Sequence, residues 1–154
     1  MGPVVGFLAL SAHLLAAAGW FGAMAYSLAV VQPRSERFLG DERSSEAFAV
    51  ELAAGARYPV LAVIAVLALS GAVLIVDADA QGTAWWALVA LKAALLVAAT
   101  ALFAVISWRL WPRRLFAPAA GLPAVRAGFR RIAVVLTALV AAEIVLGAAA
   151  ATLA

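Results

Sequence analysis

Four long apolar stretches, separated by three more polar connections, dominate the pattern of the chain. They cover residues 4–31, 58–76, 84–108 and 132–153. Each is long enough to cross a hydrocarbon layer of about 30 Å as a helix. We expect Pro33 to end the first helix and Pro112 to close the third, because proline disfavours a helix interior. The pattern predicts an all-α integral membrane four-helix bundle in one transmembrane domain.

Composition supports this fold class and excludes others. The chain has 154 residues, of which 68% are hydrophobic and only 12% are charged. Soluble domains are about half apolar and about a quarter charged. The net charge of +3 comes without a basic stripe interleaved with aromatic residues, so no nucleic-acid partner is predicted. No Lys or Arg precedes the first stretch, which favours a retained helix over a secretory signal.

The basic residues are concentrated in two of the three connections. Ten of the eleven Lys and Arg residues are Arg34, Arg37, Arg43, Arg57, Arg109, Arg113, Arg114, Arg126, Arg130 and Arg131. The second connection, 77–83, has two acidic residues and no basic one. Cytoplasmic loops carry the excess of Lys and Arg, so both termini should face outward. We expect the bacterial inner membrane as the location.

The two basic connections differ in their predicted structure. Ser44 and Ser45 can cap a helix over residues 44–57 that lies at the interface or runs into the second span, with a kink or restart at Pro59. The third connection holds three prolines and is expected to be extended. No separate soluble domain and no convincing sequence repeat is found.

Three ionisable side chains interrupt the apolar spans, namely His13, Lys92 and Glu143. Counting along each helix at 1.5 Å per residue places all three roughly 12–15 Å below the outer surface, with Ser70 somewhat shallower. An isolated charge in a bilayer costs about 2.5–3.5 kcal/mol on insertion scales, so such groups usually face the bundle interior and pair.

Each of these groups also has a plainer interpretation. Lys92 can extend outward to water, or form a structural pair with Glu143 that fixes the helix register. His13 can be a packing residue, and Ser70 can hydrogen-bond to its own backbone. Metal and haem chemistry is restricted to His13, Glu143 and Lys92, because the chain has one histidine and no cysteine. A bis-histidine haem cannot form within one chain, whereas a ring held by His13 alone can.

Several segments resemble the first, second, third and last spans of the copper-resistance D (CopD-like) membrane family. They are the run from His13 to Gly22 with Val31-Gln-Pro-Arg34, Leu69-Ser-Gly71, the surroundings of Lys92, Arg130-Arg131, and Glu143-Ile-Val-Leu-Gly147. This resemblance implies copper handling. The pairing of a first-span His with a third-span Lys is also similar to HemJ-like porphyrinogen oxidases, and this implies haem ligation by His13 and a carboxylate partner for Lys92.

Three functions follow as hypotheses. The first is a CopD-like protein that handles copper, with His13 and Glu143 as ligands, or a haem-type cofactor, held by His13 and Lys92. The second is an accessory subunit of a larger respiratory or photosynthetic complex, or a homo-oligomer, in the lipid bilayer. The third is a porphyrin-oxidising enzyme. No phosphate loop, nucleophile elbow or paired catalytic carboxylate is present in the sequence, which favours a role other than catalysis.

Overall fold

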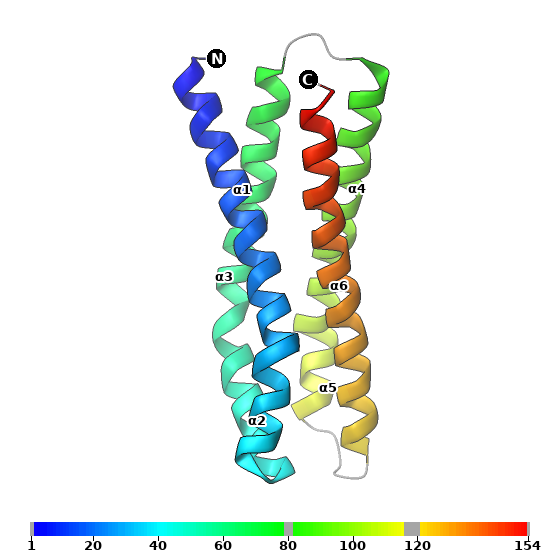
Figure 1. The fold of residues 1–154 in the computed structure, drawn as a ribbon. Helices are drawn as coiled ribbons and strands as arrows, with labels where there is room; N and C mark the ends of the chain where they lie inside the picture. Colours follow the sequence, from blue (N-terminus) through cyan, green and yellow to red (C-terminus); the bar gives the residue numbers. More distant parts are fainter. Residues whose placement is uncertain (1, 79–81, 116–120, 154) are drawn as a thin grey trace.

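Two helical hairpins lie side by side in the computed structural model, which describes residues 2–78, 82–115 and 121–153 (Figure 1). The first hairpin consists of α1 (Pro3–Tyr26), a π-helical segment (Ser27–Val31), α2 (Gln32–Leu39) and α3 (Glu42–Asp77). The second consists of α4 (Thr83–Ala104), a π-helical segment (Val105–Leu110), α5 (Trp111–Leu115) and α6 (Leu122–Ala151). The described residues form no strand, so the predicted all-α class is confirmed.

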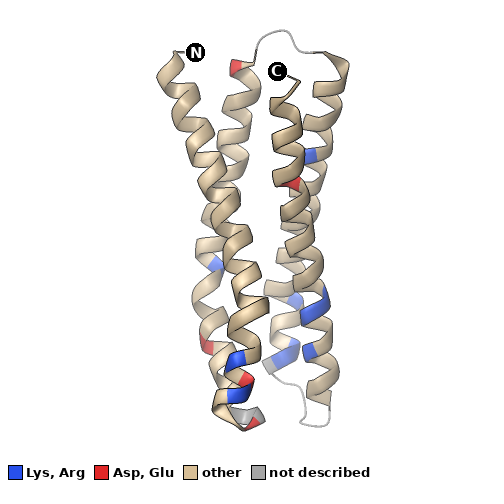
Figure 2. Cartoon of the chain, in the orientation of Figure 1, with Lys and Arg blue, Asp and Glu red and all other residues tan. Residues whose placement is uncertain are grey.

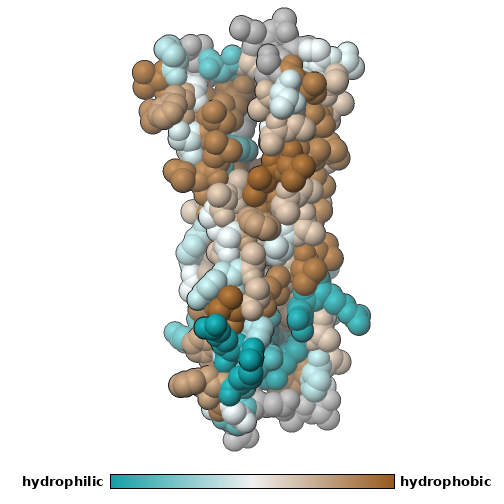
Figure 3. Space-filling view, in the orientation of Figure 1, coloured by the Kyte–Doolittle hydropathy of each residue, from teal (hydrophilic) through white to brown (hydrophobic). Residues whose placement is uncertain are grey.

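Four continuous helical stretches are long and apolar enough to cross a membrane. They are Pro3–Leu39, Ser44–Asp77, Thr83–Arg114 and Leu122–Ala151. Their outer surfaces are apolar, as shown by Leu15 and Leu69, whose side chains are 74% and 70% exposed. Figure 3 shows hydrophobic side chains over most of one face and hydrophilic ones gathered at the end opposite the termini. By length and composition the chain is an integral membrane protein.

The two prolines expected to stop helices do not stop them. Both hairpins instead contain a widened turn just before the proline: the Gln32 N–H donates to the Ser27 carbonyl, and the Trp111 N–H donates to the Ile106 carbonyl. These bonds span five residues instead of four. A proline ring clashes with the carbonyl four residues earlier, and the wider turn relieves that clash. The helix therefore continues through Pro33 to Leu39, and through Pro112 to Leu115.

The turn between α2 and α3 corrects a second expectation. Gly40 ends α2 with φ +69°, a conformation that glycine adopts at little cost. Asp41, rather than Ser44 or Ser45, caps α3, because its Oδ1 accepts a hydrogen bond of 2.8 Å from the Ser44 N–H. The segment 44–57 is the first part of α3 and runs into the second span, and Pro59 lies inside this one helix.

The third connection is shorter than its prolines suggest. Helix α6 begins at Leu122, and Pro123 occupies its first turn, where a missing N–H has no cost. Arg126, Arg130 and Arg131 therefore lie on a helix and not in an extended loop. Pro118, which the same expectation covered, lies outside the described residues.

The core is a small apolar cluster to which all four long helices contribute. It consists of Trp20, Leu67, Ala99, Leu136 and Val140. Helix α1 packs against α3 and α6, and α4 packs against α6. Ala99 is completely buried, so its small side chain lets neighbouring helices approach closely. This packing brings side chains from separate spans within reach of one another.

Candidate functional site

A polar layer lies in the half of the bundle nearest the termini. His13 is ten residues from the start of α1 and Lys92 nine from the start of α4. Glu143 is eight residues before the end of α6, and Ser70 seven before the end of α3. At 1.5 Å per residue these positions are about 10–15 Å from that end of the bundle. The polar groups that sequence counting placed at one depth therefore do lie at similar distances along their helices.

The first hairpin supplies a neutral, hydrogen-bonded pair. His13 Nδ1 lies 2.8 Å from Ser70 Oγ, and the Ser70 hydroxyl donates to the Val66 carbonyl at 2.5 Å. A hydroxyl has one proton to donate, and with that proton directed to Val66 the Nδ1–H is the donor toward Ser70. In the neutral imidazole, Nε2 is then the nitrogen with the lone pair. A Cβ added to Gly71 would lie 3.4 Å from His13 Cε1, so this glycine lets the ring sit close to α3.

The second hairpin supplies an amine and a carboxyl group that interact electrostatically. Lys92 interacts electrostatically with both Glu143 and His13. Its ammonium nitrogen lies so close to α6 that a Cβ added to Gly147 would be 2.9 Å from Nζ. Glu143 Oε1 is buried and accepts no hydrogen bond from the described residues. A buried acceptor without a donor is costly, so among the described residues of the layer this oxygen is an unsatisfied hydrogen-bond acceptor.

These positions answer part of what the sequence left open. Lys92 is half-buried with its amine against α6, so it belongs to the bundle interior instead of reaching outward from it. Ser70 donates a hydrogen bond to its own helix, as expected. It also forms a hydrogen bond with His13, a contact that the sequence did not reveal. The Ser70-Gly71 pair was the available signal, because a hydroxyl followed by a glycine provides both an acceptor and room for a ring.

The donor set can be compared with the two predicted cofactors. The described residues contain no group of three or more His, Cys, Asp or Glu side chains that could hold a metal ion. His13 and Glu143 also share their surroundings with the Lys92 ammonium, which repels a metal cation. A haem-type ring needs only one axial nitrogen, and its carboxylates suit a neighbouring ammonium. By donor type alone, the residues suit a ring with one axial nitrogen better than a bare ion.

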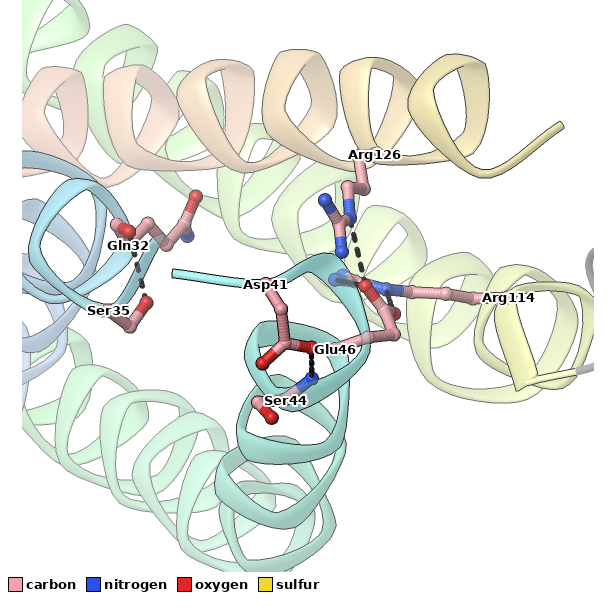
Figure 4. Close-up of polar contacts among 7 residues, drawn as sticks. All are labelled: Gln32, Ser35, Asp41, Ser44, Glu46, Arg114 and Arg126. Carbon is pink, nitrogen blue, oxygen red and sulfur yellow. Dashed lines mark hydrogen bonds and ion pairs between the residues drawn. The ribbon is translucent and has the colours of Figure 1, made fainter. Parts of the chain in front are cut away.

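A second polar region lies at the opposite end and was not predicted as a site. Figure 2 shows that most Lys and Arg residues gather there. Glu46 of α3 accepts hydrogen bonds from Arg114 of α5 and Arg126 of α6 (Figure 4). Beside this triad is a cavity of about 370 Å³ between the helices. Sequence reasoning used these arginines only to assign orientation, because it could not tell which ones turn inward.

Comparison with known proteins gives no relative. No family model matches the chain, and no curated protein or solved structure matches it. The resemblance to CopD-like and HemJ-like proteins stays a prediction from the residues that carry it.

Proposed function

We propose that the chain is a CopD-like membrane protein whose polar layer holds a haem-type cofactor through His13. The observation that supports it is the His13–Ser70 hydrogen bond, which fixes the ring and assigns the lone pair of the neutral form to Nε2. Metal-ligating histidines commonly donate their other ring N–H in this way. When bound, such a ring would supply redox or ligand-binding chemistry inside the bilayer.

The other members of the layer have distinct roles in this proposal. Lys92 interacts electrostatically with His13 and would attract a carboxylate of the ring. Glu143 offsets the charge of Lys92 and keeps one oxygen available for a donor. Copper bound by His13 and Glu143 is the weaker alternative, because two donors beside an ammonium are a poor site for a soft cation. A HemJ-like oxidase would use the same residues but adds a catalytic reaction.

The test is an absorption spectrum and metal analysis of protein purified in detergent from cells supplied with a haem precursor. The proposal predicts a Soret band that His13→Ala abolishes and Lys92→Met weakens. Thr137→Val is the matched control, because the Thr137 hydroxyl donates to its own helix, to the Ala133 carbonyl at 2.8 Å, and has no other hydrogen-bond partner among the described residues. Wild-type protein without a Soret band rejects the haem proposal. Bound copper that survives His13→Ala removes His13 from the metal ligands.

We also propose that the basic end faces the cytoplasm, with both termini outside, in a bacterial inner membrane. The support is the distribution of charge, since Lys and Arg are concentrated opposite the termini (Figure 2). The chain has no cysteine, so single variants Ser35→Cys and Thr152→Cys can be labelled in intact cells with an impermeant maleimide. Labelling of Cys at 152 but not at 35 is expected, and the reverse pattern contradicts this orientation.

An accessory role in a larger complex is the second candidate. Gly19 and Gly22 of α1 are exposed, and a Cβ added at either would meet nothing within 4 Å. Small residues on an open helix face allow close approach of another transmembrane helix, from a different subunit or a second copy of this chain. Native purification with a mild detergent tests this role. Migration as a lone monomer that Gly22→Leu does not change argues against it.

A further inference from the structure

The cavity of about 370 Å³ at the basic end is built from all four long helical stretches. Its charged lining consists of Arg57, Arg114, Arg126, Arg130, Glu36 and Glu46. Four guanidinium groups therefore face two carboxylates among the described lining residues, which leaves an excess of positive charge. Five uncharged polar residues and a set of aromatic and aliphatic side chains, among them Trp111, form the rest of the wall. The cavity thus has cationic, uncharged polar and apolar parts in its lining.

Arg57 is held in the cavity by a feature of the backbone. Its Nη2 donates to the Ser107 carbonyl at 2.9 Å, and its guanidinium lies 5.5 Å from the centre of the Trp108 ring. In the widened turn, the carbonyl of Ser107 would pair with the N–H five residues later, but that residue is Pro112 and has none. The proline thus creates the acceptor that fixes Arg57. Both partners are uncharged, so the positive charge of Arg57 is not neutralised by them.

Arg114 and Arg126 both bind the carboxylate of Glu46. Arg114 donates through both Nε and Nη2 to Glu46, and Arg126 Nε donates to Glu46 Oε2 at 2.9 Å. The side chains of Arg114, Arg126 and Glu46 are only 14%, 23% and 17% exposed. The cluster therefore places two partly buried guanidinium groups on the wall of the cavity, beside Glu46.

The depth of the cavity matches a lipid headgroup. Arg57 is twenty residues from the end of α3 at Asp77, and twenty residues of helix span about 30 Å, one hydrocarbon thickness. Arg57 therefore lies at the membrane interface opposite the termini. Arg130 follows Arg57 by 73 residues, the spacing that also separates Ser70 from Glu143, so the two hairpins place an arginine at corresponding positions.

We propose that this cavity binds a phosphate group, with Arg57, Arg130 and the Glu46–Arg114–Arg126 cluster as its cationic wall. Guanidinium groups match phosphate oxygens in geometry and charge. The phosphate could belong to the headgroup of an anionic phospholipid entering from the adjacent leaflet, with its chains against the apolar wall, or to free phosphate. Arginines that only assign orientation need not line a cavity. The exposed Arg131 beside Arg130 is such a residue, because it does not line the cavity.

Two binding experiments on the full chain distinguish the sources. Native mass spectrometry measures retention of dioleoyl phosphatidylglycerol against dioleoylglycerol, which lacks the phosphate. Tryptophan fluorescence measures binding of inorganic phosphate against chloride at equal ionic strength. The proposal predicts that Arg57→Gln and Arg130→Gln each weaken binding about tenfold, the effect of losing one charge-assisted hydrogen bond. Arg131→Gln is the matched control and should change it less than about twofold.

Selective retention of phosphatidylglycerol that depends on Arg57 and Arg130 identifies a lipid headgroup as the ligand. The same dependence for inorganic phosphate without lipid retention identifies a soluble anion. If neither probe exceeds its control, or if Arg131→Gln weakens binding as much as Arg130→Gln, the proposal is wrong. Circular dichroism checks folding, and if Arg57→Gln unfolds the chain then the exposed pair Arg130 and Arg131 decides.

Discussion

The two hairpins place polar side chains at corresponding positions and satisfy them differently. Lys92 follows His13 by 79 residues, the spacing that also separates Ala99 from Trp20 and Pro112 from Pro33. In the first hairpin the imidazole is hydrogen-bonded to Ser70. In the second, the amine of Lys92 interacts electrostatically with Glu143, whose buried Oε1 accepts no hydrogen bond from the described part of the chain. The architecture thus repeats where no convincing repeat is found in the sequence.

The difference shows how one helical framework can use one hairpin to hold a side chain in position and the other to provide charge. A hydrogen bond between neutral groups fixes geometry at little electrostatic cost. A half-buried charged pair is expensive to leave incomplete, and such groups inside a membrane commonly mark a functional site. The first hairpin therefore orients His13, and the second supplies charge beside it.

Trp20→Ala should have the largest effect, because Trp20 fills the core at the position that Ala99 occupies in the second hairpin. Loss of a buried tryptophan costs about 3–5 kcal/mol. Unfolding of the detergent-solubilised protein by sodium dodecyl sulfate measures the change. Leu15→Ala is the control, because Leu15 is 74% exposed and should change the free energy of unfolding little. Equal effects of the two would mean that the bundle core is elsewhere.

Lys92→Met should destabilise the protein by about 2 kcal/mol, less than the full cost of breaking a buried pair because Lys92 is only half-buried. The carboxylate of Glu143 would lose the charge that compensates it. Glu143→Gln should cost clearly less, because the remaining lysine can extend toward water. The same unfolding titration compares the two. A larger loss of unfolding free energy for Glu143→Gln than for Lys92→Met would mean that Lys92, and not Glu143, depends on its partner for stability.

Ser70→Ala should cost about 1 kcal/mol, the net value of the hydrogen bond with His13. Thr100→Val is the control, because Thr100 also donates to its own helix, to the Leu96 carbonyl at 2.7 Å, and has no described side-chain partner. The difference between the two variants isolates the histidine bond. Equal changes in the unfolding free energy would mean that Ser70 serves its own helix only.

Glycine substitutions should have the smallest effects and should differ between the hairpins. Gly147→Ala places a methyl 2.9 Å from Lys92 Nζ, the flexible end of a long side chain that can move away. Gly71→Ala places it 3.4 Å from a ring held by Ser70. We expect changes within about 1 kcal/mol for both, since alanine also favours the helix. Thermal melting should show Gly71→Ala as the less stable variant, and the opposite order contradicts a fixed ring.

The sequence was sufficient for the four apolar helices and for the set of polar residues inside them, because both depend on hydropathy and counting. It was not sufficient at the prolines. Pro33 and Pro112 lie within continuous helical stretches because a widened turn absorbs each clash, and this depends on backbone geometry that no residue type specifies.

The cavity could not be predicted from the sequence, for a related reason. Arg130 and Arg131 are adjacent and chemically identical, yet only Arg130 lines the cavity. Which of two neighbours borders the cavity depends on the rotation of α6 in the bundle, and that rotation is set by packing against α1 and α4. The cap at Asp41 was missed similarly, because Asp and Ser can both cap a helix and only the backbone conformation shows that Asp41 is the extended residue at the start of α3.

A double-mutant cycle of Lys92→Met and Glu143→Gln tests most directly whether the charged half of the layer acts as one unit. The free energies of unfolding of the two single variants and the double variant are measured in the same detergent. We predict a coupling of at least about 1 kcal/mol, with the second substitution recovering part of the loss caused by the first. For the unrelated pair Lys92 and Thr137 we expect the changes in unfolding free energy to add within about 0.3–0.5 kcal/mol. The same additivity for Lys92 and Glu143 would contradict a coupled pair.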